Sequence, residues 1–169
     1  MKPKIVNDWD LAHNLAVNFR SMGKVVVLVS GDFDIIHAGY IEFFTLAKGL
    51  GDVLIVGIGT DERFKQFRDS RGPINSLTER TSVLEGITPV DLIVPYAQEN
   101  ASVLLQFINP TIYALEEYRA TGETPEELMM KELGGTIRIL PSSSTVSELL
   151  IVERIIKRES QKKEIDSLV

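Results

Sequence analysis

The stretch at 31–40 combines glycines with side chains that could bind a phosphate group. It follows an apolar run at 24–30 and precedes a helical periodicity at 41–50, which predicts a strand, a loop and a helix. The first N–H groups of a helix lack partners within the helix, and its dipole favours negative charge there. His37 could donate to a phosphate oxygen, and Asp34 could orient a group or hold Mg²⁺. The alternative is a structural turn with an incidental histidine.

Apolar and amphipathic segments alternate along the chain and define the elements that must position this loop. Apolar runs predict strands at 25–29, 52–59, 91–94, 111–115 and 136–140. Amphipathic stretches predict helices at 8–22, 41–50, 61–68, 77–86, 101–108, 125–133 and 146 to about 158. The alternation predicts the α/β class, with a Rossmann-like, doubly wound, five-stranded parallel sheet and helices on both faces. In such sheets ligands bind beyond the carboxyl ends of the strands, where the 31–40 loop lies.

Several predicted helices begin at residues that suit an N-cap. Asn7 or Asp8 can cap the first helix, and Asn100 can cap the fifth. A Ser or Thr followed three residues later by Glu is the spacing of a capping box. This spacing occurs at Ser76 and Glu79, at Thr124 and Glu127, and at Thr145 and Glu148.

Composition limits the classes of function. The 169 residues suit one domain, so we expect a single domain over 1–169, with an N-terminal helix region at 1–23 and a frayed tail at 159–169. The net charge of −6 argues against a nucleic-acid partner. The chain has no cysteine, which excludes disulfides and thiolate chemistry. Since no apolar stretch suits a membrane span or a signal peptide, we expect no membrane partner and a cytoplasmic location.

The sequence GDFDIIHAGY at 31–40, followed by AKGLGDVLIVGIGTDE, resembles the nucleotidyltransferase superfamily with an HxGH signature. The resemblance runs from about residue 5 to residue 156. In layout the chain is most similar to the adenylyltransferase domain of bacterial ADP-heptose synthesis and to glycerol-3-phosphate cytidylyltransferase. This resemblance implies the transfer of AMP or CMP from a nucleoside triphosphate to a phosphorylated sugar or polyol, with release of pyrophosphate.

The resemblance also implies partners and site residues. Mg²⁺ would accompany ATP or CTP, a small phosphorylated acceptor would be the second substrate, and a homodimer is expected because relatives are often dimers. The metal ligands stay open. Catalytic contacts with the phosphates fall on His37, Arg68 and Tyr40. Nucleotide binding falls on Gly31, Asp32, Phe33, Asp34, Gly39, Asp61, Arg80, Ser143, Ser144 and Thr145, and acceptor binding on Glu117, Tyr118 and Arg119.

A basic segment follows the second predicted strand. Its position at the same sheet edge as His37 predicts a lid that meets the triphosphate, with a solvated loop as the alternative. The glycine and proline at 72–73 would punctuate this lid. Its cations are Arg63, Lys65, Arg68, Arg71 and Arg80.

The sequence departs from the family pattern at four places. Tyr40 replaces the second signature histidine, and a phenol carries no positive charge at neutral pH. Arg68 replaces a phosphate-binding lysine, and the arginine that usually precedes the proline is displaced by one position, to Arg71. The acceptor region at 110–118 lacks the usual aspartate and glycine. The alternative function is therefore a catalytically weak or inactive nucleotide-binding relative of the same fold.

Overall fold

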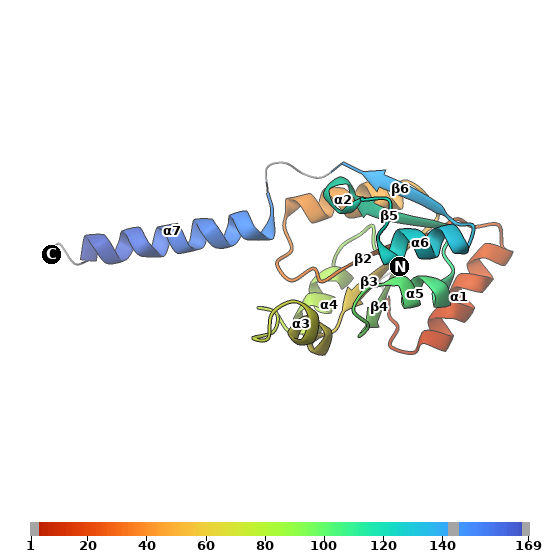
Figure 1. Ribbon diagram of the computed structural model, residues 1–169, viewed down its shortest axis with the longest axis horizontal. Helices are drawn as coiled ribbons and strands as arrows, with labels where there is room; N and C mark the ends of the chain where they lie inside the picture. Colours follow the sequence, from red (N-terminus) through yellow and green to blue (C-terminus); the bar gives the residue numbers. More distant parts are fainter. Residues whose placement is uncertain (1–3, 142–145, 167–169) are drawn as a thin grey trace.

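The fold is built on one parallel sheet, seen here in a computed structural model that describes residues 4–141 and 146–166, with side chains for 5–141 and 146–162 (Figure 1). Its six strands lie in the order β1-β4-β3-β2-β5-β6. Five of them confirm the predicted strands, whereas β1 was not predicted because two residues are too few to show a pattern. The strands are β1 (Lys4–Ile5), β2 (Val26–Gly31), β3 (Val53–Gly59), β4 (Leu92–Tyr96), β5 (Ile112–Glu116) and β6 (Thr136–Leu140).

Helices cover both faces of the sheet, as the α/β prediction requires. One core packs against α1, α5 and α6, and the other packs against α2 and α4. The helices are α1 (Trp9–Ser21), α2 (Ala38–Lys48), α3 (Asp61–Phe67), α4 (Leu77–Glu85), α5 (Ser102–Ile108), α6 (Pro125–Glu132) and α7 (Glu148–Asp166), with a short 3-10 helix, η1 (Glu117–Arg119).

The central strand β2 shows why an unbroken apolar run becomes a buried strand. Its successive side chains point to opposite faces, so Val26 and Leu28 enter one core while Val27 and Val29 enter the other. Because β2 lies in the middle of the sheet, its carboxyl end is surrounded by the ends of neighbouring strands. The loop after β2 therefore lies where several other loops can meet it.

The predicted capping signals are largely confirmed. Asp8 accepts from two backbone N–H groups of α1, and complete capping boxes begin α4 and α6, at Ser76 and Thr124. Asn100 accepts from the N–H of Ser102, but the N-cap of α5 is Ala101. The predicted cap at Thr145 lies outside the described residues.

The last helix differs from its prediction. α7 begins at Glu148 and continues to Asp166, beyond the predicted end of this helix at about residue 158. This part has neither glycine nor proline and is rich in Lys, Glu and Gln, which favour helix without any tertiary contact. α7 extends away from the sheet (Figure 1). Among the described helices, α7 included, none has the length and apolar character needed to cross a membrane.

Candidate functional site

The loop between β2 and α2 is held in a strained conformation by aromatic packing. Phe33 has a φ of 49°, in the left-handed region that bulky residues rarely adopt. Its buried ring packs against Phe44 and Tyr40, with centroids 5.1 and 5.2 Å away. A Cβ at Gly31 would lie 2.8 Å from the Phe33 ring, so this position accepts only glycine without a shift. The core therefore fixes the loop in a shape that the backbone alone would not prefer.

His37 ends this loop and begins α2 without capping it. Its ring stacks on Tyr40, with the ring centroids 4.3 Å apart and an angle of 17° between the ring planes. The buried Nδ1 atom has no hydrogen-bond partner within the described part of the chain. Burial lowers the pKa of the His37 imidazole, which favours the neutral ring. A histidine whose ring is favoured in its neutral form thus lies at the N-terminus of α2, where a helix has N–H groups without partners inside the helix.

Tyr40 and Glu148 bring the start of α7 to the signature loop. The Tyr40 hydroxyl donates to Glu148 Oε1 at 3.2 Å, and the Ile35 N–H donates to the same oxygen at 3.4 Å. Burial raises the pKa of the Glu148 carboxyl. Burial and the nearby Glu148 carboxylate raise the pKa of Tyr40. Sequence reasoning gave Glu148 only a capping role, because the two residues are far apart along the chain.

Two adjoining cavities open at this loop. The first, of about 320 Å³, brings together the predicted residues Arg68, Tyr40 and Arg119. The second, of about 290 Å³, adds His37. The first is lined by Gly31, Asp32, Phe33, Tyr40, Arg68, Tyr96, Glu116, Tyr118, Arg119 and Glu148. The second is lined by His37, Tyr40, Glu116, Tyr118, Ser147, Glu148 and Leu149.

Two arginines supply positive charge to the first cavity. Arg68 is half-exposed and lies 3.3 Å from a carboxylate oxygen of Asp32. Arg119 donates to the Ser30 carbonyl at 2.7 Å. A guanidinium has five donors, so these contacts leave each arginine able to bind a further anion. The cavity also holds acidic groups, and burial raises the pKa of the Glu116 carboxyl.

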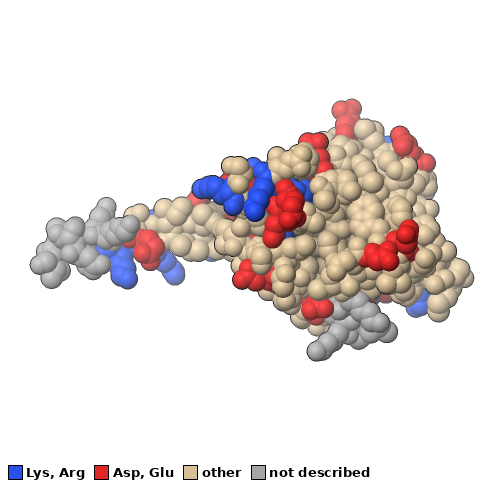
Figure 2. Space-filling model, turned by 90° about the horizontal axis from the view of Figure 1, so that it is seen from below, with Lys and Arg blue, Asp and Glu red and all other residues tan. Residues whose placement is uncertain are grey.

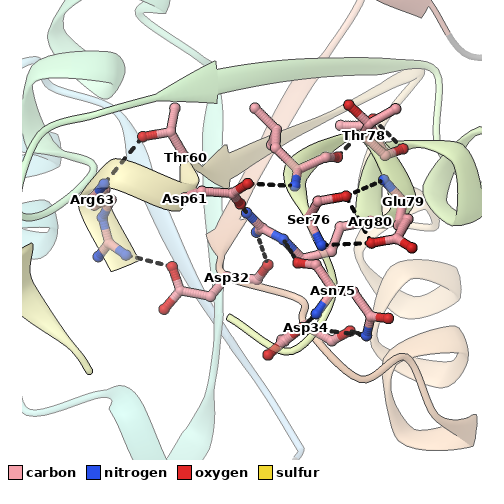
Figure 3. Close-up of polar contacts among 12 residues, drawn as sticks. Asp32, Asp34, Thr60, Asp61, Arg63, Asn75, Ser76, Thr78, Glu79 and Arg80 are labelled. Atoms are coloured by element: carbon pink, nitrogen blue, oxygen red, sulfur yellow. Dashed lines mark hydrogen bonds and ion pairs between the residues drawn. The ribbon is translucent and has the colours of Figure 1, made fainter. Parts of the chain in front are cut away.

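A polar network joins the signature loop to the segment at 61–80 (Figure 3). The Arg80 side chain is completely buried and donates to the carbonyls of Asp32 and Asn75 at 2.5 and 3.1 Å. It also donates to Asp61 Oδ1 at 2.7 Å. The two carboxylate oxygens of Asp34 accept the N–H groups of Ile74 and Asn75, both at 2.7 Å.

This network includes three residues of the sequence-based assignment. Asp34, Asp61 and Arg80 were predicted to bind nucleotide, but their polar groups are engaged by the protein itself. Each Asp34 carboxylate oxygen thus accepts one backbone N–H group. These residues hold the segment at 69–80 against the signature loop. A glycine pattern cannot reveal this, because most of the partners are distant in sequence.

The basic segment does not form the predicted lid of free cations. Arg63 is buried, pairs with Asp32, and donates to the carbonyls of Gln98 and Glu99. Arg71 is exposed and pairs with Asp69 at 2.6 Å. With Arg80 also buried, Arg68 is the arginine of this segment that lines the first cavity. On the face shown in Figure 2, positive and negative groups lie side by side near the start of α7.

The other predicted residues have varied positions. Gly39 is buried in the first turn of α2. Glu117 and Tyr118 are exposed in η1, and Tyr118 lines both cavities. Ser143, Ser144 and Thr145 lie outside the described residues. Among the side chains described, at 5–141 and 146–162, no group of three His, Asp or Glu could hold a metal ion.

A comparison with protein families gives a match over most of the chain. The sequence model described as cytidylyltransferase-like matches residues 28–163. The chain is 33% identical over 138 residues to the "Bifunctional protein HldE" of Chromohalobacter salexigens, covering 81% of this chain. It is 30% identical over 152 residues to the protein of the same name in Blochmanniella pennsylvanica, covering 89% of this chain. The chain spans only 29% and 31% of these two relatives.

Solved structures show the same architecture. A lipopolysaccharide core biosynthesis protein from Thermoplasma volcanium has a TM-score of 0.58 at 26% identity, over 72% of this chain and 98% of that one. A pantoate–β-alanine ligase from Francisella tularensis has a TM-score of 0.60 at 16% identity, over 85% of this chain and 68% of that one. The second likeness concerns the fold alone. Together with the family match, these comparisons confirm the resemblance inferred from the motif at 31–40.

Proposed function

This chain belongs to the cytidylyltransferase-like family of nucleotidyltransferases, and we propose that it transfers AMP or CMP from ATP or CTP to a phosphorylated sugar or polyol. The observation that carries this proposal is the position of His37. His37, whose buried Nδ1 atom has no partner among the described residues, lines the second cavity at the start of α2, and Arg68 and Arg119 line the adjoining first cavity. This arrangement suits a ligand with several negatively charged oxygens.

The proposed reaction requires no nucleophile from the protein. An oxygen of the acceptor phosphate attacks the α-phosphorus of the nucleotide. The bond between this phosphorus and the bridging oxygen of the β-phosphate breaks, and pyrophosphate leaves with both electrons of that bond. His37, Arg68 and the N–H groups of α2 would hold the phosphates in line and neutralise the charge that grows on them.

We propose that Mg²⁺ enters with the nucleotide. The ion commonly binds substrate phosphates together with one or two carboxylates, and retains several waters. Such a site does not need the three-residue cluster that is absent from the described part of the chain. Mg²⁺ would neutralise charge on the phosphates, and chelation should therefore stop transfer without unfolding the protein.

The experiment that tests this function is a pyrophosphate-release assay. The protein is incubated with ATP or CTP, with Mg²⁺, and with a panel of sugar and polyol phosphates. We expect release with one base and a narrow set of acceptors, and none after chelation of Mg²⁺. Absence of release in every combination, with tight nucleotide binding by calorimetry, would support the binding-module alternative. Absence of nucleotide binding would contradict both functions.

One observation favours the alternative of a weak or inactive relative. Tyr40 stands where the family signature has a histidine, and its single hydroxyl hydrogen points to Glu148. The substitution Tyr40→His tests this alternative. A large rise in the transfer rate would identify a weakened catalyst, whereas a loss of activity would show that Tyr40 is adapted to this chain's own substrate.

A further inference from the structure

We propose that Tyr40 and Glu148 act as one unit in phosphate recognition: protonation of Glu148 frees the Tyr40 hydroxyl to donate to a phosphate oxygen of the nucleotide. Glu148 is then a positioning residue that acts through Tyr40. The inference rests on the proposed function, because it requires that nucleotide phosphates enter the cavities at 31–40.

While Glu148 is ionised, the two side-chain groups share a single hydrogen, that of the Tyr40 phenol. A phenol has one O–H donor, and in this structure Tyr40 gives it to Glu148 Oε1 at 3.2 Å. While Glu148 is ionised, Tyr40 therefore turns only oxygen lone pairs to any other partner. A phosphate oxygen is also an acceptor, so it gains no hydrogen bond from Tyr40 in this state.

A proton on Glu148 changes this arrangement. The carboxyl group can then donate its own hydrogen to the Tyr40 oxygen, and the phenol hydrogen becomes available. The negative charge beside the cavity disappears at the same time. Burial of the carboxyl raises its pKa, which brings this change closer to neutral pH than for an exposed glutamate.

The packing around the pair keeps it in place. The Tyr40 ring lies between the His37 ring, at 4.3 Å, and the buried Phe33 ring, at 5.2 Å. The Ile35 N–H also holds Glu148 Oε1, at 3.4 Å. Both cavities are lined by Tyr40 and Glu148, so a ligand in either one meets the pair.

Other charged and titratable groups face Glu148 from four neighbouring segments. Those of the β2–α2 loop and the start of α2 include Asp34, whose charge opposes ionisation of Glu148. Those after β5 include a second half-buried glutamate, and the segment after α3 contributes a cation. The groups are Asp32, Asp34, His37, Tyr40, Arg68, Glu116, Tyr118 and Arg119.

The experiment measures binding of ATP and CTP with Mg²⁺, without an acceptor, by calorimetry between about pH 5.5 and about pH 8. The wild-type protein should bind about tenfold more tightly at the acidic end, in line with one added hydrogen bond to a charged group. Glu148→Ala should bind tightly at both ends, because nothing withdraws the Tyr40 hydrogen. Glu153→Ala, an exposed glutamate of the same helix, is the matched control and should behave as wild type.

A second variant separates the hydrogen bond from the charge. Tyr40→Phe keeps Glu148 but removes the hydroxyl. This variant should therefore lose most of the increase in nucleotide affinity that the wild-type protein shows at acidic pH. Protonation of the nucleotide itself affects all variants alike and cancels when each is compared with wild type at the same pH. The inference is overturned if the nucleotide affinity of Tyr40→Phe rises at acidic pH as much as that of wild type. It is also overturned if Glu148→Ala keeps the wild-type pH dependence of affinity. In both cases the proposed function stands. If neither nucleotide binds at any pH, the proposed function falls and the inference with it.

Discussion

Two regions of this protein carry the polar residues that its sequence assigns to phosphate binding, and they differ in what those residues contact. In the loop at 31–40 and the start of α2, His37 lines a cavity, and its buried Nδ1 atom has no partner among the described residues. In the segment at 61–80, Arg63 and Arg80 are buried and already donate to several protein acceptors. The two regions touch, because both the Asp32 carboxylate and its carbonyl bind arginines of the second region.

This difference distinguishes residues that can bind a ligand from residues that hold the ligand-binding loop. A donor that the protein has satisfied gains little from a ligand and costs much when it is removed. A side chain that lines a cavity and makes few contacts with the protein contributes little to folding and can contact a substrate. The comparison therefore predicts that the first region affects activity and the second affects stability.

The largest effect is expected for Arg80→Ala. The substitution leaves Asp61 and two carbonyl oxygens without their buried partner, so the unfolding free energy should fall by about 3–5 kcal/mol. Urea denaturation measures this loss. Arg71→Ala is the control: its side chain is 88% exposed, and we expect no measurable change. An Arg80 variant of normal stability that fails to bind nucleotide would restore the original assignment of Arg80 to the ligand.

His37→Ala should have the next largest effect, and it should change the transfer rate much more than the stability. Loss of one preorganised donor at a site of developing charge lowers the transfer rate by about 100-fold. The unfolding free energy should change by less than about 1.5 kcal/mol, which is the scale of a lost aromatic contact with Tyr40. Pyrophosphate release and denaturation measure the two quantities. His13→Ala is the matched control, because its Nδ1 atom contacts the Phe107 carbonyl away from the site, and its rate should equal that of wild type.

Arg68→Ala should weaken nucleotide binding by about tenfold, because one cation is lost from the first cavity. Stability should change little, since the side chain is 54% exposed. Lys65→Ala removes an exposed cation of α3, the helix that Arg68 follows, and provides the control. Equal losses of affinity in the two variants would indicate a general charge effect rather than a contact at the cavity.

The smallest effect concerns the pH dependence of stability. Burial raises the pKa of Glu148 in the folded protein, so the folded state holds this proton more firmly than the unfolded state. The contribution to stability is complete below the ordinary glutamate pKa of about 4.3 and is lost as pH rises through the raised value. Glu148→Gln should therefore remove part of the loss of stability that accompanies the rise in pH through the raised pKa. Thermal unfolding of the two proteins at several pH values measures this difference. An identical pH profile in the two proteins would contradict the pKa shift.

Much of the fold follows from local properties of the sequence. Apolar runs such as 25–29 can only be buried on both sides, and the residues at Asp8, Ser76 and Thr124 satisfy N–H groups within a few positions of themselves. These interactions act over short distances along the chain, so a pattern in the sequence is enough to predict them. The motif at 31–40 likewise predicted the loop between β2 and α2. The two residues of β1 left no comparable pattern.

The roles within the site depended on contacts between residues far apart in sequence. Whether an arginine binds a ligand or the protein is decided by the acceptors that surround it, and those of Arg80 come from Asp32, Asp61 and Asn75. Likewise, Glu148 meets Tyr40 only because α7 begins beside the loop at 31–40. The sequence by itself therefore determined the fold class, the family and the position of the loop at 31–40. The tertiary structure decided which polar groups remain free for a ligand, because burial and hydrogen-bond satisfaction are properties of the packed chain.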